Sequence, residues 1–290
     1  MKYLHYHILG FLFLVLLSSC MVEEESVGSV DGQLVHKVFD ATFEDSDMTT
    51  KTVLDETVGE HGFRGLLWDS GDEIGVARYG GYYEKFTNVL GELSAIGVFD
   101  GYIDQTSQYY AIYPYTDNQG HGTSVSVTIP TVQTYRVNSF DRNMAPMVGK
   151  GNDGERLHFM NLCGVLAVQL TGSETVKSIV FQTKNGEKVS GICSVDPDYV
   201  DYPILDTSTA TETYVTLDCG EGVQLSGEAT PFHIVLPPGE YNGFTLVIAT
   251  ADGKFMEKTT SKTLTIKRSI VTKAASFDFE DNMTDFIDLS

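Results

Sequence analysis

The sequence is poor in basic residues and lacks any cluster of them. Its 290 residues include 19 lysines and arginines against 40 aspartates and glutamates, which gives a formal net charge of −21. Proteins that bind nucleic acid need a basic surface to neutralise the phosphates. We therefore expect no nucleic acid among the partners of this chain.

Recognisable catalytic motifs are also missing. The chain has no G-x-S-x-G elbow, no H-E-x-x-H helix, no Walker loop and no S-x-x-K motif. Its histidines after the N-terminal segment are single and lack the i, i+4 spacing that presents two imidazoles to one metal: His36, His61, His121, His158 and His233. We predict no catalytic residues, no metal site and no cofactor, hence a protein that is not an enzyme. Carboxylates are plentiful, and a glycosidase pair facing across a cleft stays open because a sequence cannot place one.

Cysteine is scarce, with four in the chain and no C-x-x-C spacing. Cys163, Cys193 and Cys219 each lie within or beside an apolar run, where a thiol packs as a small hydrophobic group. We predict buried free thiols. A single disulfide with one thiol left over is the alternative, because export removes a protein from the reducing cytosol.

The chain has one apolar run at its N-terminus, and this run is too short to span a membrane. Lys2 precedes the run from Ile8 to Leu17, which Ser18, Ser19 and Cys20 follow. A membrane-spanning helix needs about 20 apolar residues, whereas a charged start, a short apolar run and small residues before a cut indicate an export signal. We expect residues 1–19 to be a lipoprotein signal peptide, Cys20 to be acylated after cleavage, and residues 20–34 to be a tether to the membrane.

From residue 33 onward, apolar residues alternate with polar ones and the 3.6-residue spacing of helices is absent. Short alternating segments that end at turn-forming residues predict an all-β chain. The clearest segments in the first half are Val35–Phe43, Gly65–Trp68, Glu73–Arg78, Tyr82–Thr87, Ala95–Ile103, Gln108–Pro114 and Ser124–Ile129. Gly71 provides the backbone freedom for a turn between Trp68 and Glu73.

The alternation stops between Asn138 and Arg156, where glycine and asparagine accumulate, and a second series of strands begins at Leu157–Leu170. We therefore expect an N-terminal β-sandwich over residues 35–156 and a C-terminal β-sandwich with a tail over residues 157–290. The Asn-Gly in Lys184–Glu187 and the Asp-Gly in Ala251–Lys254 predict hairpins.

Tyrosine and phenylalanine are frequent, with 15 and 16 copies. In a β protein such rings are usually half-buried strand residues. If Tyr82, Tyr83 and Tyr115 lay together in solvent, they would favour an alternative function, a surface lipoprotein that binds glycans for a polysaccharide-capture system.

Five segments resemble the fimbrillin-like family, the lipoprotein pilins and adhesins of mouth and gut anaerobes, and they occur in that family's order. They are Thr50–Thr52, Trp68–Val76, Tyr109–Tyr115, Asn161–Leu166 and Leu236–Tyr241. The resemblance implies two transthyretin-like β-sandwich domains in tandem, export through Cys20, and a role as a fimbrial structural subunit or adhesin. Met21–Glu25 resembles the acidic tag that directs such lipoproteins to the outside of the outer membrane.

The resemblance also implies a mode of assembly. In polymerising members, a protease cuts after a basic residue in the loop that follows the first strand, and the vacated groove accepts a strand from the next subunit. Here the candidate cut site is Arg64, and the displaced strand would carry Phe39, Ala41 and Phe43 on one face. A candidate donor is the C-terminal segment with Phe277 and Phe279. The implied partners are other fimbrial subunits, or surface proteins of a host or another bacterium.

Overall fold

The computed structural model describes residues 34–44, 67–117, 119–121, 124–279 and 284–285. Within these residues the fold is all-β, as predicted, and the single helical element is a 3-10 turn, η1, at Arg142–Met144. By its contacts, the chain from Leu34 to Ser290 is one compact unit.

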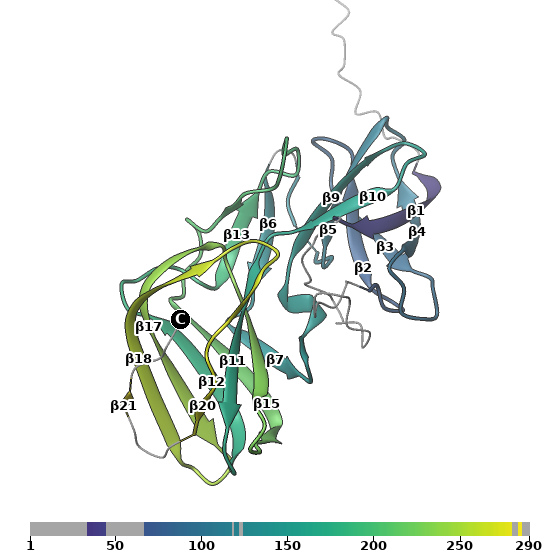
Figure 1. Cartoon of the computed structure of the whole chain (residues 1–290). Helices are drawn as coiled ribbons and strands as arrows, with labels where there is room; N and C mark the ends of the chain where they lie inside the picture. The colour runs from purple at the N-terminus through teal and green to yellow at the C-terminus, as the bar shows by residue number, and fades with distance from the viewer. Residues whose placement is uncertain (1–33, 45–66, 118, 122–123, 280–283, 286–290) are drawn as a thin grey trace, which may run out of the picture. The chain divides into compact units, whose positions relative to one another are not determined.

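Ten strands precede residue 162 in the described part of the chain. They are β1 (Val35–Phe43), β2 (Glu73–Ala77), β3 (Glu84–Asn88), β4 (Gly97–Ile103), β5 (Gln108–Tyr113), β6 (Val125–Ile129), β7 (Val132–Arg136), β8 (Ser139–Phe140), β9 (Met147–Asn152) and β10 (Leu157–Asn161). Seven of them close into a barrel in the order β1-β10-β9-β5-β2-β3-β4, in which β4 returns to β1 (Figure 1). The inward positions of these strands are mostly aromatic and β-branched, so the barrel has a packed core.

Strand β9 corrects one expectation. The glycines at 149 and 151, predicted to interrupt the strand pattern, lie inside β9, between β5 and β10. A Cβ atom at Gly149 would lie 3.0 Å from the Phe159 ring, and one at Gly151 would lie 2.4 Å from the Arg156 carbonyl oxygen. Glycine therefore marks a close approach of two strands at this point and not a break.

Eleven strands follow among the residues that the structure describes. They are β11 (Gly164–Thr171), β12 (Thr175–Thr183), β13 (Gly191–Val195), β14 (Leu205–Asp206), β15 (Tyr214–Gln224), β16 (Thr230–Leu236), β17 (Gly239–Thr250), β18 (Phe255–Ile266), β19 (Val271–Lys273), β20 (Phe277–Asp278) and β21 (Thr284–Asp285). One sheet has the order β21-β18-β17-β12-β15-β7-β8, a second has β16-β11-β19 with β20 also on β11, and a third has β14-β13-β6. The stretch Leu157–Leu170, where the second series of strands was expected to begin, contains two strands separated at Leu162–Cys163.

The β11–β16 sheet is buried on both faces. Leu166, Val168 and Leu170 pack into the core shared with β12, β15, β17 and β18. Val165 and Val235 pack into a second core, which includes β6, β13 and part of the barrel. This explains why the sequence from Gly164 to Leu170 is a nearly continuous apolar run without alternation.

Strands that precede residue 157 pair with strands that follow it, and one strand that begins at residue 157 belongs to the barrel. β6 pairs with β13, β7 pairs with β15 in parallel, and β10 belongs to the barrel. Three strands that precede residue 157 thus complete sheets of the second half, because β8 pairs with β7. The division into domains at 35–156 and 157–290 stays a prediction.

The two predicted hairpins have different outcomes. Ala251–Lys254 joins the antiparallel strands β17 and β18, and Gly253 has a φ of 84°. The hairpin predicted at Lys184–Glu187 is wrong, because β12 ends there but the next strand, β13, pairs with β6 and β14. A local turn signal does not fix which strand comes next in a sheet.

Candidate functional site

Strand β1, the strand expected to be displaced, is a full member of the barrel. It pairs with β4 in antiparallel fashion from Val35↔Ile103 to Ala41↔Gly97. On its other side it pairs with β10 in parallel at only three positions, from Ala41↔Leu157 to Phe43↔Phe159. Among the described residues, the N-terminal half of β1 is therefore paired on one side only.

The inward face of β1 follows the predicted alternation. Phe39 and Ala41 are buried in the barrel core, and Phe43 packs against it. The Phe39 ring meets the Phe86 ring at 5.3 Å and the Tyr109 ring at 4.9 Å between centroids. These contacts make β1 a major part of the barrel's apolar core.

Trp68 contacts β1 from outside the paired strands. Its indole is fully buried, and Nε1 donates a hydrogen bond to the Ala41 carbonyl oxygen at 3.0 Å. The same ring stacks on Phe43, with a centroid distance of 4.5 Å and an interplanar angle of 21°. The sequence analysis placed Trp68 on a strand beside a turn and did not predict its contacts with β1. The one available signal was that Trp68 is the single tryptophan of the chain.

The end of β1 is fixed by Glu44. The Glu44 carboxylate accepts hydrogen bonds from Arg268 Nη1 at 2.6 and 2.7 Å and from the Ser269 hydroxyl at 2.6 Å. It also accepts one from the Asn161 backbone N–H at 3.1 Å. The side chains of Glu44 and Arg268 are 11% and 23% exposed, so this ion pair is largely shielded from water. No pattern in the sequence predicted it.

Ion pairs bridge the gap where β1 diverges from β10. A cavity of about 400 Å³ lies there, and Lys37 Nζ donates across it to Asp153 Oδ1 at 2.6 Å. Asp40 and Arg156 form a second, looser pair at 3.5 Å. The hydrogen bond that Lys37 donates to Asp153 raises the pKa of Lys37. Side chains thus connect this half of β1 to residues 153–156, where the described part of the chain provides no main-chain pairing.

The candidate donor residues lie against their own chain. β20 pairs in parallel with β11 at Leu170↔Phe277 and Thr171↔Asp278. Phe279 is buried in the core of the C-terminal sheets, and Phe277 packs against that core beneath Lys258 Nζ, which lies 4.6 Å from the ring centroid. To act as a donor, this segment would first have to leave these contacts.

Two of the predicted sites lie outside the described residues, namely Cys20 and Arg64. Among the described residues, Cys163, Cys193 and Cys219 are free and buried. The same residues contain no group of three potential metal ligands. No helix in the described part of the chain is long and apolar enough to cross a membrane.

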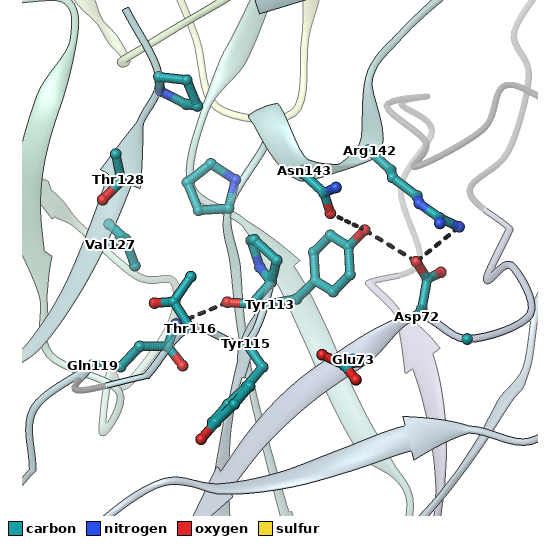
Figure 2. Close-up of a pocket in the computed structure, with 14 residues that line it drawn as sticks. Asp72, Glu73, Tyr113, Tyr115, Thr116, Gln119, Val127, Thr128, Arg142 and Asn143 are labelled. Carbon is teal, nitrogen blue, oxygen red and sulfur yellow. Dashed lines mark hydrogen bonds and ion pairs between the residues drawn. The ribbon is translucent and has the colours of Figure 1, made fainter.

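A second feature is a cavity of about 570 Å³ beside Asp72 and Tyr113 (Figure 2). Asp72 is almost fully buried and accepts hydrogen bonds from the Asp69 backbone N–H at 2.7 Å and the Tyr113 hydroxyl at 3.2 Å. Its carboxylate lies 3.2 Å from Arg142 Nη1. Burial raises the pKa of Asp72 above its ordinary value of 3.8, and the hydrogen bond from Asp69 and the charge of Arg142 oppose that shift.

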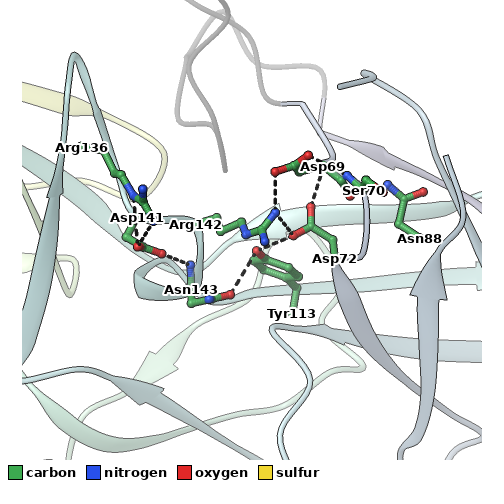
Figure 3. Close-up of polar contacts among 9 residues, drawn as sticks. All are labelled: Asp69, Ser70, Asp72, Asn88, Tyr113, Arg136, Asp141, Arg142 and Asn143. Atoms are coloured by element: carbon green, nitrogen blue, oxygen red, sulfur yellow. Dashed lines mark hydrogen bonds and ion pairs between the residues drawn. The ribbon is translucent and has the colours of Figure 1, made fainter. Parts of the chain in front are cut away.

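The charged groups around this cavity bind one another (Figure 3). Arg142 also pairs with Asp69 at 2.7 Å, and beside it Arg136 pairs with Asp141 at 3.0 Å. Glu73, on the cavity wall, pairs with Lys85 at 3.0 Å. The network therefore fastens the turn at Asp69–Asp72 to η1.

The three tyrosines considered for glycan binding do not form one exposed platform. The exposed fraction is 74% for Tyr82 and 9% for Tyr83, which point to opposite faces of an extended segment. Tyr115 is half-buried at the Asp72 cavity. Tyr82 instead packs edge-on against His121, with 5.1 Å between ring centroids.

Comparison with known proteins finds likeness in structure alone. No family model and no curated protein matches the chain. A candidate cell adhesion protein from Bacteroides ovatus superposes with a TM-score of 0.53 at 12% identity, over 85% of this chain and 93% of the other. A candidate cell adhesion protein from Bacteroides uniformis gives 0.46 at 16% identity, over 73% and 88%.

The tip fimbrial protein Mfa3 from Porphyromonas gingivalis, with a C-terminal truncation, gives a TM-score of 0.38 at 9% identity, over 87% of this chain and 97% of the other. These three neighbours are two candidate cell adhesion proteins and a fimbrial tip protein, and at a TM-score of 0.53 the Bacteroides ovatus protein shares the fold of this chain. The resemblance to fimbrillin-like proteins that the sequence motifs indicated is confirmed at the level of the fold.

Proposed function

We propose that the protein is a cell-surface lipoprotein that serves as a structural subunit of a fimbria or as an adhesin, and that it joins other subunits by strand addition at the position of β1. It acts by binding protein chains, without catalysis. Its partners are other fimbrial subunits, or surface proteins of a host or another bacterium. In this proposal Cys20 carries the acyl chains that hold the protein on the outer membrane.

The way in which β1 is held in the barrel carries the proposal. Without β1, the edge of β4 from Gly97 to Ile103 loses its main-chain partner, and the aromatic rings around Phe39 lose their cover. An apolar groove beside an unpaired edge is the setting in which strand addition supplies both main-chain hydrogen bonds and buried side chains. Each Å² of apolar surface covered contributes about 25 cal/mol.

The fold supports the same proposal, because the Bacteroides ovatus protein with this fold is a candidate cell adhesion protein. The finer description, two transthyretin-like domains in tandem, is part of what we propose. So is the cut at Arg64, in the segment between β1 and β2, which would free β1 to leave.

Limited proteolysis tests strand addition. The mature chain with Cys20 replaced by serine is treated with an arginine-specific protease, and its mass and oligomeric state are followed by mass spectrometry and light scattering. We expect a cut at Arg64 followed by assembly, and an intact monomer for the Arg64→Ala control. A chain cleanly cut at Arg64 that stays monomeric would remove the polymerising subunit and leave the adhesin.

Acylation has its own test. Cells that express the full chain are labelled with a clickable fatty acid, and the Cys20→Ala variant is the matched control. We expect label in the outer-membrane fraction for the full chain only. Equal labelling of both chains would exclude Cys20 as the anchor.

A further inference from the structure

We infer that Trp68 sets the register of any strand that occupies the β1 position, and that the strand which fits has an aromatic, a small and an aromatic residue at alternate positions. This inference rests on the proposed strand addition and adds to it the kind of partner that the barrel accepts. Trp68 is here a specificity-determining residue, which recognises the backbone of the occupant as well as its side chains.

The hydrogen bond to the Ala41 carbonyl excludes a slip of one residue. Ala41↔Gly97 is the last pair of the β1–β4 ladder, and the indole Nε1 donates to the Ala41 carbonyl just where that ladder ends. Successive carbonyls along a strand point in opposite directions. A strand displaced by one residue would turn its carbonyl away and leave a fully buried N–H without an acceptor. It would also turn its apolar face outward.

A small side chain at position 41 excludes a slip of two residues. Ala41 is fully buried, and its neighbour across the ladder is Gly97. A Cβ atom added at Gly97 would lie 2.8 Å from the Trp68 ring and 2.5 Å from the Phe99 ring, so the indole fills the space above this pair. A displacement by two residues would bring Phe39 or Phe43 to this position, where overpacking opposes it.

The two flanking positions favour aromatic residues. One lies between the Phe86 and Tyr109 rings and is filled by Phe39. The other is the face of Trp68 on which Phe43 stacks. Together the three positions define the inferred pattern, in the direction antiparallel to β4.

The C-terminal tail of this chain does not supply that pattern in the register given by its phenylalanines. Adjacent positions of the pattern are two residues apart. If Phe277 takes the first aromatic position, or Phe279 the second, the other phenylalanine falls on the small position. If Phe279 takes the first aromatic position, Asp281 falls on the small position. The remaining register places Ala275 on the small position and Phe277 on the second aromatic position, but it brings Lys273 to the first aromatic position. We infer that a strand with the full pattern comes from a different protein chain, and that the tail of a second copy occupies this position only weakly.

Peptide exchange tests the inference, and Trp68 reports on it because it is the single tryptophan of the chain. The chain nicked at Arg64 is incubated with excess labelled peptide of residues 34–44, which has no tryptophan. Binding is measured by anisotropy, and occupancy of the groove is measured by Trp68 emission. The variant peptides are Ala41→Phe and Phe43→Ala, with Val38→Ala as the control because Val38 is half exposed. A peptide of residues 271–279 represents the tail.

We expect the native and Val38→Ala peptides to bind alike, and the Ala41→Phe, Phe43→Ala and tail peptides to bind at least about tenfold more weakly. Equal binding of Ala41→Phe and native peptides would overturn the inference and leave strand addition standing. If no peptide enters the nicked chain, including the native one, strand addition itself fails and the inference falls with it.

The Trp68→Phe variant tests the backbone contact separately. Phenylalanine keeps a ring against Phe43 but has no donor for the Ala41 carbonyl. We expect this variant, once circular dichroism shows it folded, to bind the native peptide about tenfold more weakly. Unchanged affinity in the folded variant would exclude the Nε1 hydrogen bond as a determinant of register.

Discussion

Glu44 and Arg268 are 224 positions apart in the sequence, yet the Arg268 guanidinium donates to both carboxylate oxygens of Glu44 at 2.6 and 2.7 Å. Glu44 directly follows β1, and Arg268 lies in the connection between β18 and β19. The first strand of the barrel is therefore fastened to the last third of the chain as well as to its barrel neighbours. Release of β1 requires this ion pair to break.

The Glu44→Ala variant should be less stable by about 2 kcal/mol, because it removes the charged acceptor of the largely shielded Arg268 and of the buried Ser269. Urea unfolding followed by circular dichroism measures the change. Glu240→Ala is the matched control, since Glu240 is exposed. Equal midpoints for the two variants would show that the pair contributes nothing to stability.

Gly97→Ala should destabilise the barrel by about 2 kcal/mol or more, because its Cβ atom would collide with the Trp68 and Phe99 rings. Gly91→Ala is the control: a Cβ atom at Gly91 meets nothing within 4 Å, and its φ is not in the left-handed region. Thermal unfolding of both variants gives the comparison. A Gly97→Ala protein as stable as Gly91→Ala would mean that the rings move aside without cost.

Asp72 should make folding less favourable as pH rises. Burial raises the pKa of Asp72 in the folded state, so between its ordinary value of 3.8 and the raised value the folded state binds more protons than the unfolded state. The free energy of unfolding therefore falls through this window. The difference between wild type and Asp72→Asn, measured in urea from about pH 3 to pH 7, should decline with rising pH and then level off. A difference that rises over this range would contradict a raised pKa.

The three described cysteines should be unreactive in the folded protein. Burial raises the pKa of Cys193 to about 11 and that of Cys219 to about 12, and it raises the pKa of Cys163 further. The reactive thiolate is thus scarce at about pH 8, and the thiols are shielded from reagents as well. In a chain with Cys20 replaced by serine, a thiol reagent should modify none of them in buffer and all three in urea. One modified thiol in urea would instead indicate a disulfide.

Most strands of the barrel could be predicted from the sequence, because period-two alternation is a local property, whereas the expected N-terminal fold was a sandwich and the closure into a barrel was not predicted. The bounds of β1, Val35–Phe43, and its inward face agree with the prediction residue by residue. β9 was missed because its glycines are selected by the close approach of β10, which no local pattern shows. The hairpin at Lys184–Glu187 failed for a related reason, since the partner of β13 is β6, about 60 residues earlier.

The candidate site could be predicted only in part. Alternation identified Phe39, Ala41 and Phe43 as one face of a strand. The contacts that hold this strand, from Trp68 and from Glu44 with Arg268, join residues distant in sequence. Nothing in the spacing of single polar or aromatic residues indicates such pairs. They can be identified only once the fold brings these residues together.

The interleaved sheets have a consequence for biosynthesis. A ribosome finishes β6 more than 60 residues before it reaches the end of β13, the strand that completes the ladder of β6. In that interval β13 does not yet cover Val125, Val127 and Ile129. The nascent chain therefore exposes an unpaired strand edge and apolar side chains that favour aggregation. Fragments that stop near residue 156 would keep this hazard permanently, so soluble expression should require the chain to extend at least through Val195.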